Sequence, residues 1–550
     1  MKRLLRGGLV VDGAGGPARP ADVLVGLDVI EDVAPRGSIP DSAADGVVDA
    51  SGKIVAPGFI DLHSHGDLVL ALEDEPLRRR LVHGRLAQGI TTEVVGNCGL
   101  GAAPVAPAHA RELRDIVAWM TPKDEAWRWR TVGEYLDRLE DLGVPVNVAT
   151  LVAHGALRVE EAGLQRTLPR GGSVAAMATS LDRALGEGAF GMSLGLIYPP
   201  GSFTPSSEID PLARILAGRD ALLTAHVRGS SETLLPAVAE ILAYGRDSGV
   251  RVHHSHSEAV GPAHWGKISR VLTLEDGARR QGVRVTYDMF PYTAAATSMA
   301  AIYPPWALAG GLTALVDRLR DPATRARVRR DVSSFVPEWP PWGEGGWAHN
   351  LVLAVGWRRI TVGTVATETA RWAEGMSLAA LGERAGCDPF DAISDLMIAE
   401  EGRVSQIIHG ISGDDSDDSG LVALLADPHG AFCTDANDTG RGLPHPAAYG
   451  TFPKILGEFV RGRGTITLEE AIRKMTSYPA AILGLTDRGV IRKGARADLV
   501  VFDPAEIGSA ATFADPRRMA VGIELVMVNG EIAVERGELR SMDAGRVLRR

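Results

Sequence analysis

The sequence contains little cysteine, only 3 residues in 550. Three cysteines in a chain this long cannot form a disulfide framework, so a reducing, cytoplasmic location is expected. The sequence also lacks an apolar run of the roughly 18–20 residues that a membrane span needs, and Arg6 interrupts the only apolar stretch at its start. Basic clusters are absent and the net charge is −11. Nucleic acids and membranes are therefore not expected partners.

The composition is that of an ordinary globular protein, with 45% hydrophobic and 23% charged residues. A chain of this length has room for one large domain and a smaller one. Short β-prone segments with Gly and Pro turns fill residues 1–57. A similar texture returns over residues 488–550, where Asn529-Gly530 predicts a hairpin. We therefore expect a small β-sandwich domain built from both termini.

Residues 58–487 alternate short apolar runs with helical stretches, a pattern typical of a parallel α/β barrel. We predict a distorted (β/α)8 barrel of the TIM type. The helical stretches are residues 131–142, 174–186, 231–248 and 270–282. The candidate strands end at or near His65, Cys98, His154, Leu196, His226, His256, Asp288 and Asp435. Active sites of such barrels lie at the carboxyl ends of the strands, which is where these polar residues fall.

A metal site is predicted from the same strand ends. His63 and His65 lie two residues apart in a strand and therefore share one face. Four further candidate ligands end other strands: Cys98, His226, His256 and Asp435. Zinc accepts imidazole, thiolate and carboxylate, and a catalytic zinc keeps one position for water. Six ligands suit either one tight site with auxiliary groups or a two-metal site with a bridging group.

Motifs across most of the chain resemble those of one enzyme family. The most specific is Asn97-Cys98-Gly99, which follows a strand that contains Thr91-Thr92. The other motifs are residues 57–65, 88–99, 193–200, 225–228, 288–292 and 445–453. The chain is similar to the N-acyl-D-amino-acid deacylases (D-aminoacylases) of the amidohydrolase superfamily. That branch has cysteine where most of the superfamily has a bridging carboxylated lysine or a glutamate.

The resemblance implies a ligand set. A tight zinc would be held by Cys98, His226 and His256, with His63 and His65 at a second, weaker metal position. Strand phase alone leaves both His254 and His256 open, and the family's Ser-His motif selects His256.

Asp435 is the expected general base as well as a metal ligand, because Cys433-Thr434-Asp435 resembles the family's Ser/Thr-Asp motif. A metal would lower the pKa of water and polarise the scissile carbonyl. Asp435 would accept the proton and pass it to the leaving nitrogen. The alternative role for Asp435 is capping of the turn that follows. The expected reaction is hydrolysis of a linear amide, most simply deacylation of an N-acyl-D-amino acid.

An insertion over residues 299–375 holds six of the ten tryptophans. Long insertions at the catalytic face of a barrel usually form lids or pocket walls. The alternative is a satellite subdomain whose tryptophans fill its own core. Periodicity does not separate the two.

Four residues are expected to bind the substrate: Tyr198, Arg228, Glu258 and Tyr292. Glu258 stands where a typical family member has lysine, and Ala447 stands where a basic residue usually follows His445-Pro446. A free α-carboxylate on the substrate needs charge-assisted donors. We hypothesise that the substrate lacks this carboxylate or carries a cationic or larger group in its place.

Two other functions are kept as alternatives. A cyclic amidase, hydantoinase-like or lactam-opening, typically carries the bridging lysine that Cys98 replaces here. A catalytically silent relative that serves as a binding protein usually loses ligands, whereas all six are present. The expected partner is a small N-acyl molecule, and the sequence does not indicate an oligomeric state.

Overall fold

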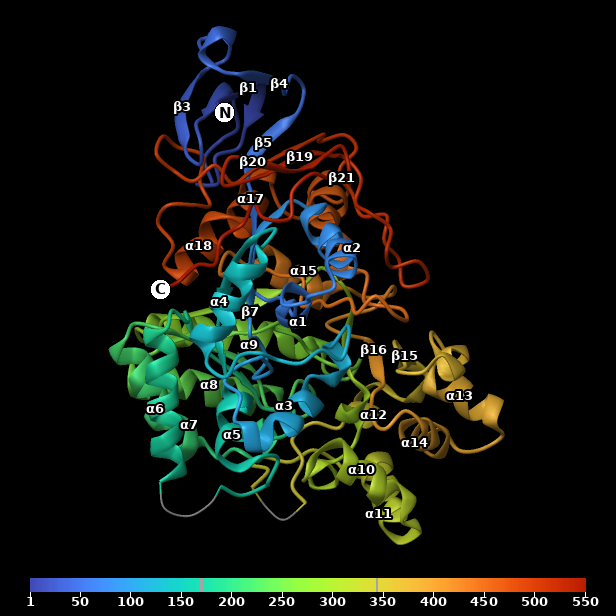
Figure 1. The fold of residues 1–550 in the computed structure, drawn as a ribbon. Helices are drawn as coiled ribbons and strands as arrows, with labels where there is room; N and C mark the ends of the chain where they lie inside the picture. The colour runs from blue at the N-terminus through green and yellow to red at the C-terminus, as the bar shows by residue number, and fades with distance from the viewer. Residues whose placement is uncertain (169–171, 343–344) are drawn as a thin grey trace.

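One mixed sheet contains strands from both ends of the chain and lies above the barrel in Figure 1. The computed structural model describes residues 1–168, 172–342 and 345–550. The strand order is β21-β20-β19-β18-β5-β1-β2-β3, with β4 paired to β1. The bounds are β1 Arg3–Val10, β2 Arg19–Val25, β3 Ile30–Pro35, β4 Gly46–Asp49, β5 Ile54–Pro57, β18 Leu499–Phe502, β19 Ile523–Val528, β20 Glu531–Glu535 and β21 Glu538–Leu539. The predicted β domain therefore does draw on both termini.

The sheet depends on the turn chemistry that the sequence predicts. Asn529 and Gly530 join β19 to β20 with φ values of 46° and 80°. A two-residue hairpin needs this left-handed backbone, which Asn and Gly tolerate best. Leu5, Val23 and Leu499 bury their side chains in the core of the sheet.

Two parallel sheets form the barrel, in the orders β6-β7-β8 and β9-β10-β11-β12-β13-β17. The bounds are β6 Phe59–Asp61, β7 Ile90–Val95, β8 Asn147–Thr150, β9 Val152–Ala153, β10 Gly191–Gly195, β11 Leu222–His226, β12 Arg251–His254, β13 Val285–Met289 and β17 Gly430–Phe432. β8 and β9 flank Leu151 in one run of chain, which connects the two sheets. At the opposite seam the Asp435 amide donates to the His63 carbonyl (2.9 Å), and the His65 amide donates to the Ala436 carbonyl (3.3 Å). This is the distorted barrel that the alternating pattern predicts.

Helices cover the outside of the barrel (Figure 1). The four stretches predicted as helices correspond to α4, α6, α8 and α9, with ends that differ by a few residues at most. The helix bounds are α1 Asp67–Leu70, α2 Glu75–Leu86, α3 Ala110–Ile116, α4 Val132–Leu142, α5 His154–Ala162, α6 Ser173–Gly186, α7 Ser206–Gly218, α8 Leu234–Ser248, α9 Ile268–Arg280, α15 Ser419–Ala426, α16 Ala447–Lys454, α17 Leu468–Met475 and α18 Ser477–Leu483. Within the described ranges, no helix combines the length and the apolar character that crossing a membrane requires.

Four strands end earlier than the sequence predicts. β6 ends at Asp61, so His63 and His65 lie beyond it and not within a strand as predicted. β7 ends at Val95, β12 at His254 and β17 at Phe432. The predicted end residues Cys98, His256 and Asp435 therefore lie in the turns beyond, each with a positive φ. Left-handed backbone cannot continue a β ladder, which explains why the strands stop before these residues.

A satellite layer lies between β13 and β17 and has a hydrophobic core of its own. Its elements are β14 Ala294–Ser298, α10 Gly311–Arg320, α11 Pro322–Ser334, α12 Leu351–Val355, β15 Ile360–Val362, α13 Leu378–Ala385, α14 Pro389–Ala399 and β16 Ser405–His409. Trp347 is buried in this core, whereas Trp342 and Trp372 are 40% and 47% exposed. His349 and Leu351 from the same layer line the cavity described below. The insertion thus combines both roles considered for it, because it has its own core and also supplies a wall.

A buried polar network holds the β domain against the barrel. Asp498 accepts hydrogen bonds from Arg488 Nη1 (2.6 Å), from Asn147 Nδ2 at the start of β8 (3.1 Å) and from the Asn529 amide (2.7 Å). Asn529 Nδ2 also donates to Asn147 Oδ1 (2.8 Å). All four side chains are buried. The ion pair between Arg488 and Asp498 is therefore shielded from solvent.

Removing one partner of this pair should destabilise the fold. We expect Asp498→Ala to lower the free energy of unfolding by about 3–5 kcal/mol, because Arg488 keeps a buried charge without its partner. Denaturant unfolding followed by circular dichroism measures the change. Arg246→Ala breaks the solvent-exposed pair with Asp247 and should change stability by less than about 0.5 kcal/mol. Equal losses in the two variants would contradict a structural role for the buried pair.

Candidate metal centre

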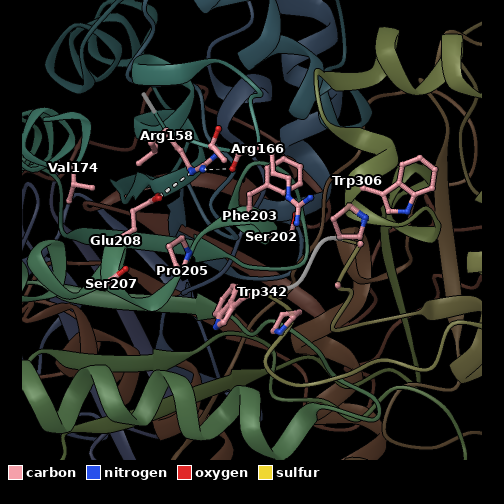
Figure 2. A pocket seen from close by; sticks show the side chains of 16 residues that line it. Arg158, Arg166, Val174, Ser202, Phe203, Pro205, Ser207, Glu208, Trp306 and Trp342 are labelled. Carbon is pink, nitrogen blue, oxygen red and sulfur yellow. Dashed lines mark hydrogen bonds and ion pairs between the residues drawn. The ribbon is translucent and has the colours of Figure 1, made fainter. Parts of the chain in front are cut away.

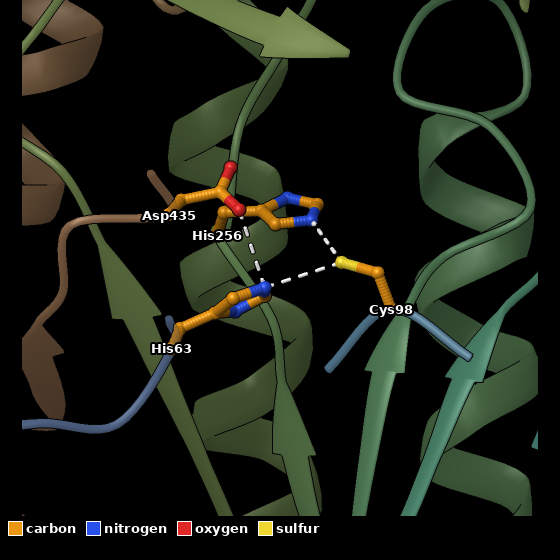
Figure 3. Close-up of side chains that lie close together, drawn as sticks. All are labelled: His63, Cys98, His256 and Asp435. Atoms are coloured by element: carbon orange, nitrogen blue, oxygen red, sulfur yellow. Dashed lines mark hydrogen bonds and ion pairs between the residues drawn. The ribbon is translucent and has the colours of Figure 1, made fainter. Parts of the chain in front are cut away.

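Four predicted ligands from four different barrel strands converge at one point (Figure 3). Donor atoms of His63, Cys98, His256 and Asp435 all lie within 4.8 Å of one another. His63 Nε2 is 3.2 Å from Cys98 Sγ and 3.2 Å from Asp435 Oδ1. His256 Nε2 is 3.5 Å from Cys98 Sγ. Because each residue follows a different parallel strand, the barrel itself brings them together.

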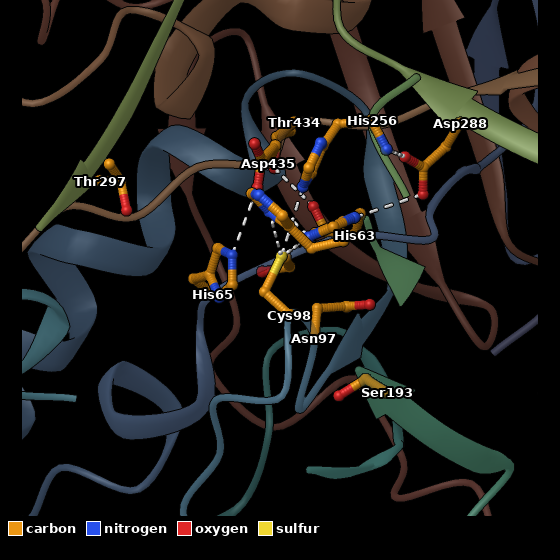
Figure 4. A network of polar contacts seen from close by, with 12 residues as sticks. His63, His65, Asn97, Cys98, Ser193, His256, Asp288, Thr297, Thr434 and Asp435 are labelled. Atoms are coloured by element: carbon orange, nitrogen blue, oxygen red, sulfur yellow. Dashed lines mark hydrogen bonds and ion pairs between the residues drawn. The ribbon is translucent and has the colours of Figure 1, made fainter. Parts of the chain in front are cut away.

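The other two predicted ligands lie against the same cluster. His65 Nε2 is 3.2 Å from Asp435 Oδ1 on one side (Figure 4). His226 Nδ1 is 3.7 Å from Cys98 Sγ on the other. The structure thus brings all six together.

The turn that presents Cys98 is built by its neighbours in the sequence. Asn97 Nδ2 donates to the carbonyls of Val94 (2.9 Å) and Leu62 (3.3 Å), which joins the ends of β7 and β6. Gly96 has a φ of 80°, and a Cβ there would lie 2.2 Å from the Leu151 carbonyl oxygen. Only glycine fits this close approach. The Gly-Asn-Cys sequence therefore sets the position of the thiol.

Backbone strain is concentrated in the cluster. Cys98, His256 and Asp435 have φ values of 54°, 35° and 45°. Residues other than glycine rarely adopt this region, at a cost of roughly 1–3 kcal/mol each, and such outliers gather at functional sites. The turn after β12 explains the choice between two histidines. His254 is the last residue of the strand and bonds Glu275 through Nδ1 (2.8 Å), whereas His256 lies in the turn and faces the cluster.

Asp288 supports the cluster from behind. Its carboxylate lies 3.4 Å from His63 Nδ1 and 2.9 Å from His253 Nε2, and it accepts a hydrogen bond from the His256 amide (Figure 4). Burial alone would raise the pKa of Asp288, but His63 and His253 outweigh it and hold that pKa well below the usual range. A carboxylate on the far nitrogen of a ligating histidine fixes the ring and its tautomer. The sequence placed Asp288 at a strand end without assigning it this role.

The donor set suits a soft or borderline divalent cation such as zinc. Burial raises the pKa of Cys98 to about 11, so a thiolate at this position requires a cation beside it. Burial, with a smaller contribution from His256, holds the pKa of His226 well below its usual value. His226 is therefore neutral, the form of imidazole that binds a metal. These residues fit the predicted metal.

A cavity of about 30 Å³ opens beside the cluster. Its lining includes two residues predicted to bind substrate, Tyr198 and Glu258. Tyr198 donates to or accepts from Thr297 Oγ1 (2.8 Å), and its ring packs edge-on against His226. Burial and the charge of Asp435 raise the pKa of Glu258 to about 8. The other side chains of the wall have no predicted role and come from loops and the satellite layer: Leu100, Trp119, Ile197, Val260, Ala295, Ala296, Thr297, His349, Leu351, Ile408 and Ile411.

The other two residues predicted to bind substrate lie outside this set of lining residues. Arg228 is buried, pairs with Glu240 (3.0 Å) and stacks 4.3 Å from the centre of the Trp342 ring. It lines a small adjoining cavity, which shares Ile197 and His349 with the first. The Tyr292 ring packs against His445, with ring centres 4.9 Å apart.

A much larger cavity of about 530 Å³ lies farther out, with Trp306 and Trp342 in its wall (Figure 2). Arg158 in its wall is already paired, through Nε, with Glu208 (3.1 Å). None of the six clustered residues lines this cavity, so its size does not make it the reaction centre. It shares Pro305 and Pro341 with the small cavity beside Arg228.

Comparison with known proteins agrees with this geometry. The amidohydrolase family profile matches residues 46–217 and 377–534. The N-acyl-D-glutamate deacylase of Alcaligenes xylosoxydans xylosoxydans is 34% identical over 555 residues, which covers 100% of this chain and 96% of that protein. The chain belongs to the amidohydrolase family. Within it, the chain falls in the D-aminoacylase branch, as its motifs predict.

Solved structures extend the comparison to metal content. The N-acyl-D-glutamate deacylase of Bordetella bronchiseptica, solved with zinc and a phosphonate mimic of the tetrahedral intermediate, is 31% identical with a TM-score of 0.79, covering 100% of this chain and 99% of that one. A D-aminoacylase described as having a binuclear metal centre, with one-metal activation and second-metal attenuation, is 29% identical with a TM-score of 0.79 and the same coverage. Relatives of this chain therefore hold metal on the same fold.

Loss of the Cys98 thiol should abolish tight metal binding. We expect Cys98→Ala to weaken metal retention more than about 100-fold, since even groups outside the ligand shell contribute 10–100-fold. Metal content after dialysis against a series of chelators measures this. Cys387→Ala removes an exposed thiol and serves as the matched control. Equal metal content in the two variants would contradict the assignment.

Proposed function

We propose that the protein is a zinc-dependent amidohydrolase that removes the acyl group from an N-acyl-D-amino acid or a related N-acyl compound. The observation that carries this proposal is the convergence of six ligand-type side chains, Asp435 included, beside a buried cavity. Family membership and the names of the relatives support the reaction class. A reduced Cys98 is required, which agrees with the cytoplasmic location expected from the sequence.

The ligand roles follow the predicted assignment. Cys98, His226 and His256 would hold a tight zinc, and His63 and His65 would serve a second, weaker position, with Asp435 in reach of both. Zinc bound there would polarise the scissile carbonyl and lower the pKa of a water molecule. Asp288 would hold the His63 ring in place through its Nδ1 atom.

Asp435 is proposed to move the proton. Burial would raise its pKa, but His63, His256 and His65 outweigh burial and keep that pKa below the usual value. The carboxylate is therefore ionised at neutral pH and can accept a proton from the attacking water. It can then deliver this proton to the leaving nitrogen. Its position between His63 and His65 keeps Oδ1 at the cluster.

An apolar cavity adjoins the reaction centre and suits the acyl portion. It measures about 50 Å³ and shares Leu100, Trp119, Ile197 and Tyr198 with the catalytic cavity. The rest of its wall is mostly apolar: Ile116, Leu164, Pro199, Ala300, Ala301, Leu308 and Leu312. Burial of methylene groups here would stabilise a bound acyl chain. The catalytic cavity itself holds roughly two water molecules, so its walls must widen to admit substrate.

Hydrolysis of N-acyl-D- and N-acyl-L-amino acids by the zinc-loaded protein tests the proposed function. The panel includes matching compounds whose carboxylate is blocked as an amide. Release of the free amine from any D compound supports deacylation. Metal uptake without hydrolysis of any member of the panel would contradict the proposed function.

Asp435→Asn should separate proton transfer from binding. The amide cannot accept the proton, so we expect kcat to fall about 10²–10⁴-fold with little change in KM. Steady-state kinetics on the best substrate of the panel measures the effect. Asp247→Asn neutralises a solvent-exposed carboxylate and should leave kcat unchanged. A kcat for Asp435→Asn close to that of the unaltered protein would rule out the general base role.

Filling the apolar cavity should restrict the acyl group. Ala301→Phe places a ring in its wall, so we expect kcat/KM for octanoyl substrates to fall about 10-fold or more. The corresponding acetyl substrates do not reach this cavity and provide the internal control. An equal loss for acetyl and octanoyl substrates would show that the acyl chain lies elsewhere.

A further inference from the structure

Glu258 brings a carboxylate into the catalytic cavity in addition to Asp435. Glu258 is 8% exposed, and its Oε1 atom lies 3.9 Å from His256 Nδ1, too far for a hydrogen bond. The Glu258 carboxylate is therefore not hydrogen-bonded to this imidazole.

The described residues that line this cavity include no lysine and no arginine. His65, His226, His256 and His349 are the only basic side chains among them. Arg228 lines the adjoining cavity and not this one, where Glu240 bonds its Nε and Nη2 atoms and its Nη1 atom has no hydrogen-bond partner. The cavity thus offers acceptors of hydrogen bonds and apolar surface, but no cationic side chain for an anion.

A substrate with a free carboxylate beside the scissile bond would meet this wall unfavourably. The carboxylate would lose its hydration on entering a buried cavity, where no lysine or arginine among the described lining residues replaces that hydration. Carboxylates are recognised by charge-assisted donors, which this wall lacks. An N–H group in the same place would instead donate to Glu258 and replace the hydrogen bonds it gave to water.

We propose that the amine portion of the substrate presents an N–H donor, as in a carboxamide or an ammonium group, to Glu258 and carries no free carboxylate beside the scissile bond. Glu258 is then a specificity-determining residue that accepts this hydrogen bond. The inference rests on the proposed deacylation and narrows its substrate class to N-acyl amino acid amides and N-acyl amines.

The test compares N-acetyl-D-leucine with N-acetyl-D-leucinamide, using the full-length, zinc-loaded protein. We expect kcat/KM for the amide to exceed that for the free acid by about 10-fold or more, the range associated with leaving a buried polar group unpaired. Glu258→Lys should reverse this preference, because it supplies the missing cation. Glu258→Gln keeps the shape, replaces one acceptor oxygen with an amide donor and should reduce the preference. Glu232→Lys makes the same charge change at a residue outside the cavity wall and should leave the ratio unchanged.

Binding of the products gives a readout that does not depend on turnover. D-leucinamide should inhibit the unaltered protein more strongly than D-leucine, and Glu258→Lys should invert that order. Equal or better hydrolysis of the free acid would overturn the inference while deacylation stands. Hydrolysis of neither compound, nor of any other member of the panel, would overturn the proposed function and this inference with it. A Glu258→Lys variant that folds and binds zinc but leaves the ratio unchanged would also overturn it.

Discussion

The burial of one thiol among ionisable groups is the constraint on which the rest of the structure depends. Cys98 lies within hydrogen-bonding range of three imidazoles, and Asp435 lies against two of the cluster's histidines. A dry site of this composition is costly unless its members share a compensating charge. A divalent cation would supply that charge, deprotonate the thiol and use the lone pairs of neutral histidines. The donor set therefore argues for a metal before any comparison with relatives does.

The fold meets this constraint through the barrel and its seams. Parallel strands carry all six proposed ligands to one face, and backbone bonds of His63, His65 and Asp435 form the seam between the first and last strands. Three of the proposed ligands are thus also residues that join the strands. Strained backbone at Cys98, His256 and Asp435 persists because the packed barrel around them leaves no relaxed alternative. A change at the cluster consequently acts on the barrel and not only on the metal.

The sequence predicts which six side chains cluster, but it predicts the cavity poorly, for physical reasons. Parallel strands put the residues that follow them at one face, so position after a strand was enough to predict that these six side chains come together. Turns beyond the strands change the strand phase, which is why His254 and His256 could not be separated without the family motif. The cavity wall comes from Trp119, Thr297 and His349, which lie in segments far apart in the chain. Nothing in their local sequence marks them, because tertiary packing alone brings them to the site.

Membership in a family determines the chemistry more firmly than the substrate. The proposed ligands would act at the scissile bond, so the reaction constrains them. Groups that contact the rest of the substrate are free to differ, because only relative affinity depends on them. Glu258 is one of the groups that contact the rest of the substrate. It lines the cavity, and its carboxylate lies 3.9 Å from His256 Nδ1, outside the group of proposed ligands. The reaction class inferred from relatives and the substrate inferred from the cavity wall are therefore separate conclusions. The wall of this chain favours a substrate that presents a hydrogen-bond donor over one that presents a carboxylate.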